Sequence, residues 1–279
     1  MADKEPSTTG GYRARGVSPN TSPQLPLVSV VTAVFNGKHY ITGCIESVLQ
    51  QDYPNVEHII IDGGSTDGTL DVLRDYTDRV AYWHSERDRG VYDAWNKALQ
   101  IARGEWICFL GADDEFLPGA ISAYMQLAAR RPDAEYLSSR ERWVHSNGSE
   151  RIKGAAWSWR RFRRWNCASH VGSMHRRTLF DRLGTYDLSF GSVADYELLL
   201  RARDTLRSAY MSTITVMVRA GGMTDSRRAL TEATRAKIRT GGRNQLVAMA
   251  ELCFAQLKYP LRPLRRAFDT IFHLAVSTL

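Results

Sequence analysis

Residues 27–34 read LVSVVTAV, an apolar run between Pro26 and the turn-forming pair Asn36-Gly37. A short apolar run bounded by turn formers is typical of a strand that is buried on both faces. Similar runs follow at residues 56–61, 80–83 and 106–110. Apolar residues at helical spacing predict helices over residues 40–51, 66–76, 91–103 and 118–130. This alternation predicts an α/β fold with a mostly parallel sheet flanked by helices.

The composition is that of an ordinary soluble globular protein, with 43% hydrophobic and 24% charged residues among 279. No run of 18 apolar residues occurs, so the sequence predicts no transmembrane helix. Residues 1–26 are rich in Ser, Thr, Pro and Gly and lack an apolar stretch, so we expect a disordered tail rather than a secretory signal. The four cysteines lie far apart, which favours free thiols in a reducing, cytoplasmic setting.

The net charge of +7 hides an asymmetry between the two halves of the chain. Residues 1–150 hold 14 Lys and Arg against 21 Asp and Glu, whereas residues 151–279 hold 23 against 9. Such asymmetry favours an anionic partner for the basic half. Nucleic acid, a phosphorylated small molecule and an anionic membrane all fit this pattern, and composition does not choose among them.

Acidic residues follow the predicted strands. Ligands of parallel sheets bind at the carboxyl ends of the strands, where the loops at residues 35–38, 62–67, 85–90 and 111–115 should meet. Asp113 and Asp114 are adjacent carboxylates, which are costly to bury unless a cation or a hydroxyl-rich ligand satisfies them. Mg²⁺ and Mn²⁺ take such oxygen ligands together with substrate phosphates, which favours a metal–diphosphate site. The alternative is a polar turn in which an Asp caps the next helix.

The loop after the second predicted strand reads DGGSTDGT, residues 62–69. Its glycines permit close approach of the backbone to a ligand, and Ser65 or Thr66 can cap the next helix. The loop is neither a Walker A loop nor a G-x-G-x-x-G fingerprint. It therefore counts against an NTPase and against a dinucleotide-dependent enzyme.

Four segments carry a resemblance to a known family. Residues 28–36 (VSVVTAVFN), 47–54 (SVLQQDYP) and 60–69 (IIDGGSTDGT) together resemble the family-two glycosyltransferases of the GT-A fold. Residues 85–98 (SERDRGVYDAWNKA) resemble the matching segment of a bacterial subgroup that builds cell-surface polysaccharides and glycolipids. The resemblance implies a GT-A-like, Rossmann-like catalytic domain over residues 27–226. Its nucleotide-binding half is 27–116 and its acceptor half is 117–226, and a basic helical extension follows over 227–279.

Enzymes of this family transfer a sugar from a nucleoside-diphosphate donor with inversion, using a divalent metal such as Mn²⁺ or Mg²⁺. The resemblance implies that Asp113 lies near the ribose and that Asp114 and Asp113 form the metal motif. It implies nucleotide contacts from Thr32, Asn36, Asp62, Ser65 and Asp88. Arg89 is a candidate partner for the diphosphate, because a guanidinium offers planar bidentate geometry.

One position departs from the family pattern. Many members have a second Asp, which often reads the uracil, where this chain has Gly63. The base of the donor is therefore left open, and UDP is the favoured prediction.

The candidate general base is Asp195. Residues 192–201 (SVADYELLLR) resemble the family segment that carries this base just before a helix. A carboxylate there would deprotonate an acceptor hydroxyl as it attacks the anomeric carbon. Taken without the resemblance, Asp195 is equally compatible with a helix cap or a surface acid.

The acceptor half contains further candidates. His170 and His175 flank residues 171–174, where the family often has a polar residue near the acceptor or the metal, and the alternative is a pair of core histidines. Residues 221–226 (GGMTDS) resemble a mobile segment that follows the catalytic helix, and we interpret them as a lid.

Two basic segments suggest a membrane surface. Residues 157–165 (WSWRRFRRW) interleave four arginines with four aromatic residues, and residues 252–279 combine apolar residues with arginines in an amphipathic pattern. The alternatives are aromatic rings that pack inward and a C-terminal helix that packs on the catalytic domain or on a partner subunit.

The sequence thus predicts a metal-dependent, inverting glycosyltransferase. We expect a UDP-sugar donor and a glycan or lipid-linked acceptor in surface polysaccharide or glycolipid synthesis, at the cytoplasmic membrane face. The alternatives are a non-catalytic nucleotide-binding member of the fold and a nucleic-acid-binding protein that uses the basic half. Nucleic acid is not the expected partner, because it leaves the acidic loops without a use.

Overall fold

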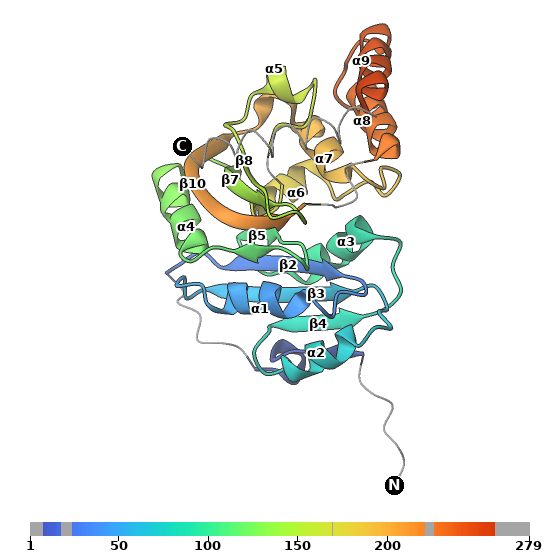
Figure 1. Ribbon diagram of the computed structural model, residues 1–279. Coiled ribbons are helices and arrows are strands. Elements are labelled where there is room, and N and C mark those ends of the chain that lie inside the picture. Colours follow the sequence, from blue (N-terminus) through green and yellow to red (C-terminus); the bar gives the residue numbers. More distant parts are fainter. Residues whose placement is uncertain (1–7, 18–23, 169, 221–225, 260–279) are drawn as a thin grey trace, which may run out of the picture.

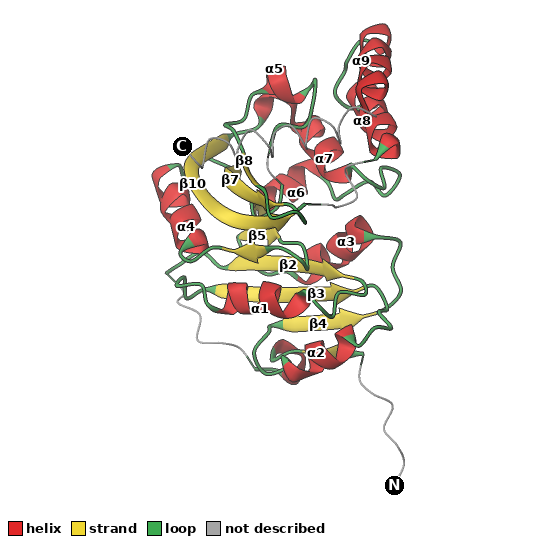
Figure 2. Ribbon diagram, viewed as in Figure 1, coloured by secondary structure: helices red, strands yellow, loops and turns green. Residues whose placement is uncertain are grey.

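The computed structural model describes residues 8–17, 24–168, 170–220 and 226–259. A ten-stranded mixed sheet runs through the described part of the chain, with helices packed on it (Figures 1 and 2). The strands are β1 (Thr9–Gly10), β2 (Val28–Val34), β3 (Val56–Asp62), β4 (Tyr82–Ser85), β5 (Trp106–Phe109), β6 (Glu115–Phe116), β7 (Tyr136–Val144), β8 (Glu150–Lys153), β9 (Met174–Arg176) and β10 (Ser208–Arg219). The helices are α1 (Ile41–Leu49), α2 (Thr69–Asp75), α3 (Val91–Ile101), α4 (Ala120–Arg130), α5 (Trp159–Phe162), α6 (Arg177–Leu183), α7 (Ala194–Ala202), α8 (Arg227–Arg239) and α9 (Gln245–Lys258), with 3₁₀ turns η1 (Arg13–Arg15) and η2 (Arg203–Thr205).

The strand order is β1-β4-β3-β2-β5-β9-β7-β10-β6, with β8 paired to β7. The four strands β4, β3, β2 and β5 run parallel to one another. Strands β9 and β6 are antiparallel to their neighbours, and β7 pairs in parallel with β10. The predicted fold class is confirmed: an α/β protein whose central strands are parallel and flanked by helices. The third predicted strand lies two residues later than expected, as β4.

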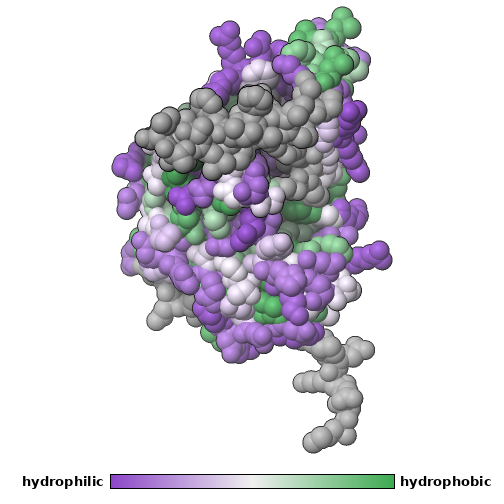
Figure 3. All heavy atoms as spheres, viewed as in Figure 1, coloured by the Kyte–Doolittle hydropathy of each residue, from purple (hydrophilic) through white to green (hydrophobic). Residues whose placement is uncertain are grey.

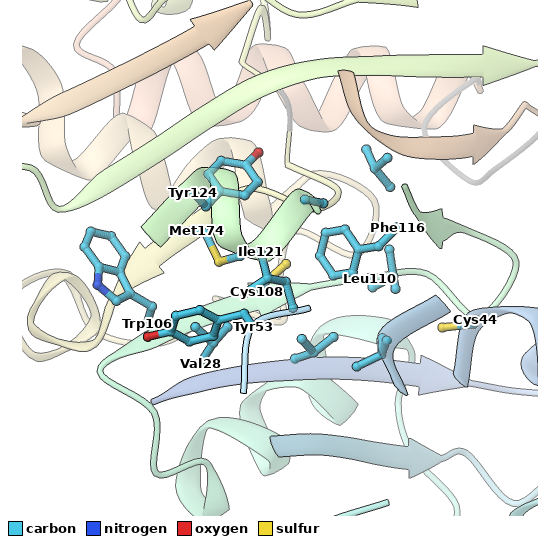
Figure 4. Packing of buried hydrophobic residues seen from close by; sticks show 14 of the residues in the cluster. Val28, Cys44, Tyr53, Trp106, Cys108, Leu110, Phe116, Ile121, Tyr124 and Met174 are labelled. Carbon is cyan, nitrogen blue, oxygen red and sulfur yellow. The ribbon is translucent and has the colours of Figure 1, made fainter. Parts of the chain in front are cut away.

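Strand alternation sends successive side chains of β2 to opposite faces of the sheet. Val28, Val30 and Val34 join a cluster with α1, α2 and α4, which includes the residues drawn in Figure 4. Val31 joins a second cluster on the other face, with α3, α6 and α7. Because both faces are covered, β2 is apolar along nearly its whole length, which is the pattern that the sequence shows.

The prediction of a disordered tail over residues 1–26 is wrong for residues 8–17. Strand β1 pairs antiparallel with the edge strand β4, with Thr9 opposite His84. The next turn brings Arg13 to Glu57, whose carboxylate also accepts hydrogen bonds from the Ser29 hydroxyl and the Arg103 amide. Glu57 is 3% exposed, so this ion pair offsets the cost of burying its charge.

The C-terminal extension is helical over its described part, in α8 and α9, which pack against each other and, through α8, on α7. Across the described ranges, no helix combines the length and the apolar composition that a bilayer crossing requires. In the segment 157–165, Phe162 is fully buried and Trp157 stacks on it, with ring centroids 4.3 Å apart, whereas Trp165 is exposed. The inward-packing alternative thus holds for two of the four aromatic residues, and Trp165 remains at the surface.

The Arg13–Glu57 pair yields a stability prediction. We expect Arg13→Met to lower the free energy of unfolding by about 2–4 kcal/mol, because it leaves a buried carboxylate without its cation. The matched control is Arg15→Met, since Arg15 pairs with Asp78 at the surface and such exposed pairs contribute about 0–1 kcal/mol. Urea unfolding of both variants measures the difference, and equal losses would contradict a structural role for residues 8–17.

Candidate functional site

The loops that follow β2, β3, β4 and β5 meet at one edge of the sheet, and Asp62 organises this edge. Asp62 ends β3 and is fully buried. Its carboxylate accepts hydrogen bonds from the backbone amides of Gly64 and Ser65 at 3.1 and 3.0 Å. It also accepts hydrogen bonds from the Ser65 hydroxyl and, at 2.6 Å, from the Ser85 hydroxyl at the end of β4. In this structure both Asp62 oxygens therefore bind the protein's own groups.

A second set of hydrogen bonds joins the loop after β2 to the loop after β3. The Asn36 amide donates to the Ser65 hydroxyl at 2.7 Å, and the Asn36 side chain accepts from the Thr66 amide at 3.0 Å. The amides of Gly37 and Lys38 donate to the Thr69 hydroxyl and the Asp67 carboxylate, both at 3.0 Å. Asn36 and Ser65, two predicted site residues, are thus brought together in a loop pair that is fixed before any ligand arrives.

Thr32 lies away from this edge. Its side chain is fully buried on the α1 face of the sheet, where its hydroxyl lies 3.0 Å from His58 Nε2 and 3.5 Å from Cys44 Sγ. Burial lowers the pKa of His58 to about 3, so the ring is neutral. This geometry argues against a direct nucleotide contact from Thr32. The physical reason is strand alternation, which points residue 32 to the same face as Val30 and Val34.

Asp88 lies next to Gly63, the position where the sequence departs from the family pattern. A Cβ atom built on Gly63 would lie 2.8 Å from Asp88 Oδ2. The absent side chain at residue 63 is therefore what makes room for the Asp88 carboxylate. Arg89 lies beyond it with a largely exposed guanidinium, 3.1 Å from Asp93 on α3.

Asp114 is the buried member of the carboxylate pair. It is 5% exposed, and Asp113 beside it is half-buried. Burial, followed by the charge of Asp113, raises the pKa of Asp114 to about 7. One Asp114 oxygen accepts a hydrogen bond from the Arg219 amide at 3.0 Å. Two adjacent carboxylates, one of them buried and destabilised in its charged form, are a donor set that fits a hard divalent cation.

The protein supplies only part of a complete coordination sphere. Among the described residues, no three His, Cys, Asp or Glu side chains gather into a group that could hold a metal ion. A cation at Asp113 and Asp114 would therefore need further oxygen ligands from a bound substrate, as Mg²⁺ commonly takes from phosphates.

Arg219, at the end of β10, is a site residue that the sequence did not reveal. Its guanidinium lies 3.6 Å from the Glu115 carboxylate and 5.5 Å from the Tyr40 ring centroid, and its side chain is 47% exposed. It places a positive charge beside the two acidic residues. The sequence offers no clue to it, because Arg219 and Asp114 are 105 residues apart.

Asp195 lies in the first turn of α7 and is 9% exposed. Its carboxylate accepts a hydrogen bond of 2.8 Å from the Tyr92 hydroxyl, at the start of α3. Burial raises the pKa of Asp195 above its usual value, while the Tyr92 hydrogen bond acts in the opposite direction. Tyr92 is the second site residue missed by the sequence, although it lies within the quoted segment 85–98.

His170 and His175 lie in the core rather than at the acidic edge. The His170 ring stacks on Phe109 with ring centroids 5.4 Å apart, and burial lowers the pKa of His170 to about 3. His175 is fully buried, and burial holds its pKa well below the usual value. Both rings are therefore neutral core residues, which favours the core interpretation. Of the predicted lid, residues 221–225 lie outside the described residues.

Parallel strands that end in hydrogen-bonded acidic loops, with a buried carboxylate on an adjoining helix, define a nucleotide-sugar transferase of the GT-A type. Residues 29–181 match the family described as glycosyl transferase family 2, and the chain belongs to that family.

Relatives and solved structures agree with this assignment. The chain is 36% identical to an uncharacterised glycosyltransferase of Mycobacterium tuberculosis over 183 residues, 63% of this chain and 69% of the relative. It is 28% identical to a "PGL/p-HBAD biosynthesis glycosyltransferase" of Mycobacterium bovis over 202 residues, 68% and 75% of the two chains.

Two solved structures share the fold. TarS of S. aureus, residues 1–349 in complex with UDP-GlcNAc, superposes with a TM-score of 0.60 at 18% identity, over 85% of this chain and 73% of that one. A mannosyltransferase of Pyrobaculum calidifontis in complex with GDP-Man and Mn²⁺ gives 0.62 at 20% identity, over 95% and 86%. These likenesses establish the fold alone.

Proposed function

We propose that this glycosyltransferase moves a sugar, with inversion, from a UDP-sugar to a hydroxyl of a glycan or lipid-linked acceptor in surface polysaccharide or glycolipid synthesis. The observation that carries the proposal is the buried Asp195 carboxylate, held by Tyr92 at the start of the helix that follows the Asp88 loop. The related M. bovis enzyme is named for glycolipid synthesis, and the TarS structure holds a UDP-sugar. Both names support these choices of acceptor and donor.

The donor would bind along the fixed edge of the sheet. The loops held by Asn36, Asp62 and Ser65 would receive the nucleoside, with Asp88 beside Gly63 as a hydrogen-bond acceptor. Asp113 and Asp114 would hold the divalent cation, which, when bound, offsets negative charge on the diphosphate. Arg219 and Arg89 offer guanidinium groups to the same diphosphate.

The chemistry needs a base on the acceptor side. The Asp195 carboxylate would take the proton of the acceptor hydroxyl as its oxygen forms a bond to the anomeric carbon. The bond from that carbon to the diphosphate breaks with its electron pair going to the diphosphate, and attack from the opposite face inverts the configuration. Tyr92 would hold the Asp195 carboxylate in place through its hydroxyl, and it stays protonated because burial and Asp195 raise the pKa of Tyr92 well above its usual value.

The alternatives explain less of the structure. A non-catalytic nucleotide-binding member of the fold has no use for a buried carboxylate at residue 195. A nucleic-acid-binding protein has no use for the paired carboxylates Asp113 and Asp114, and it predicts binding that weakens steeply with salt.

Substitution of the base tests the mechanism. We expect Asp195→Asn to lower the transfer rate at least about 100-fold, because general base catalysis contributes about 10²–10⁴-fold. The Tm should stay the same or rise at neutral pH, since the raised pKa means that the charged carboxylate costs folding free energy there. Asp204→Asn, on the exposed η2 turn, is the control. Retention of more than a tenth of the rate would contradict the role of Asp195.

The pH profile gives a second readout of the same base. Activity should fall as the pH drops through the raised pKa of Asp195, because the protonated acid cannot accept a proton. Tyr92→Phe removes a hydrogen bond that stabilises the charged form, so the acid limb should move to higher pH. Tyr124→Phe, which removes a buried hydroxyl bonded to Ser139, should leave the limb in place.

The metal prediction concerns Asp114. We expect Mn²⁺ and UDP together to raise the Tm by about 5 °C or more at ligand concentrations near 100 times Kd. EDTA should remove this increase, and Asp114→Asn should not show it. Asp133→Asn, at an exposed turn, serves as the control. A UDP-induced shift that is the same with EDTA, or the same in Asp114→Asn, would sink the metal role.

We also propose that α8 and α9 rest on an anionic membrane surface. Leu246, Phe254 and Leu257 are 81%, 60% and 75% exposed on α9, and hydrophobic atoms gather there at the upper right of Figure 3. Residues 227–258 hold seven Lys or Arg against two Glu. Apolar side chains beside clustered cations are typical of interfacial helices.

Vesicle sedimentation tests this surface. The protein should bind vesicles that contain phosphatidylglycerol more strongly than phosphatidylcholine vesicles, and the double variant Phe254→Glu/Leu257→Glu should lose most of that binding. Ile152→Glu, at an exposed apolar residue of β8, should retain it. Equal binding by all three proteins would rule out α9 as the contact.

A further inference from the structure

A partly open cavity of about 190 Å³ lies beside the proposed base, between α7, α8, α9 and the segment after α5. Its walls are mostly apolar. They are formed by Trp165, Val193, Ala229, Leu230, Ala233 and Leu252, among others. Asp195 is one of the lining residues, so the cavity and the proposed catalytic centre share a wall.

We propose that this cavity binds an apolar aglycone of the acceptor, an aryl ring or a short alkyl segment, attached to the sugar that receives the transferred residue. The inference rests on the proposed function, because it takes Asp195 as the base. An acceptor whose hydroxyl meets Asp195 brings its neighbouring atoms to the mouth of this cavity.

The size of the cavity suits one ring. An engineered apolar cavity of about 150 Å³ binds benzene, so about 190 Å³ accepts a phenyl group or an alkyl segment of similar volume. The space exists because the facing residues are small. Ala229 and Ala233 lie one turn apart on α8, and Ala255 lines the cavity from α9.

The chemistry of the walls favours an apolar occupant over a further sugar. A buried sugar needs a hydrogen-bond partner for each hydroxyl, and an unpaired hydroxyl costs free energy. The polar wall residues are largely engaged: the Thr234 hydroxyl donates to the Leu230 carbonyl at 2.9 Å, and Lys237 Nζ lies 3.6 Å from the Glu251 carboxylate. Alanine and leucine side chains supply most of the remaining surface.

Paired acceptors test the inference. A panel of sugars is offered with a UDP-sugar, each as the methyl and the p-nitrophenyl glycoside. For the sugar that is used, we expect the KM of the p-nitrophenyl glycoside to be at least tenfold lower. Ala233→Phe, which fills the cavity, should abolish that difference, and Ala255→Phe should do the same from the facing helix. Ala250→Phe, the same change at an exposed position of α9, should preserve it.

A binding measurement keeps the test independent of turnover. In saturation-transfer difference NMR, the aromatic protons of the p-nitrophenyl glycoside should receive saturation from the wild-type protein and lose it in Ala233→Phe. Equal KM values for the two glycosides in the wild type, or aromatic saturation that survives in both filling variants, would overturn the aglycone site while leaving glycosyl transfer intact. Absence of UDP binding and of turnover of every UDP-sugar would instead overturn the proposed function.

Discussion

The site depends on the burial of one carboxylate, that of Asp62. A buried charge is costly unless hydrogen bonds satisfy it, and at the end of β3 the donors come from Gly64, Ser65 and Ser85. Ser65 in turn accepts a hydrogen bond from the Asn36 amide. One charge therefore fixes the loops after β2, β3 and β4 relative to one another. A ligand that binds there does not have to order them, which lowers the entropic cost of binding.

The sequence predicts the features that local patterns determine. The four parallel strands are short, apolar and bounded by turn formers, and each is found within two residues of its expected place. The meeting of Asp62, Asn36 and Asp114 at one edge also follows, because parallel strands bring their carboxyl ends together. Thr32 shows the limit of assignment by resemblance alone. Its place in the strand is right, yet the two-residue period of the strand turns its hydroxyl inward.

Contacts between distant parts of the chain could not be predicted in this way. Arg13 meets Glu57 across 44 residues, and Tyr92 meets Asp195 across 103. Neither pair has a periodic pattern, because each contact is set by how whole elements pack. Strand β1 has two residues and lies at the sheet edge, so no run of apolar side chains marks it. Composition therefore favoured disorder where a buried ion pair holds the chain in place.

Asp114 and Asp195 show how one physical cause can prepare two different tasks. Burial is the largest contribution to the raised pKa of each carboxyl. Asp114 has a second carboxylate beside it, so a nearby cation relieves more repulsion there than at an isolated acid. Asp195 has a phenol hydroxyl as its partner, and Tyr92 can hold the carboxylate without neutralising it. A carboxylate that is desolvated but not neutralised gains most from taking up a proton. The neighbours of the two acids, rather than the depth of their burial, therefore suit one to a metal and the other to proton transfer.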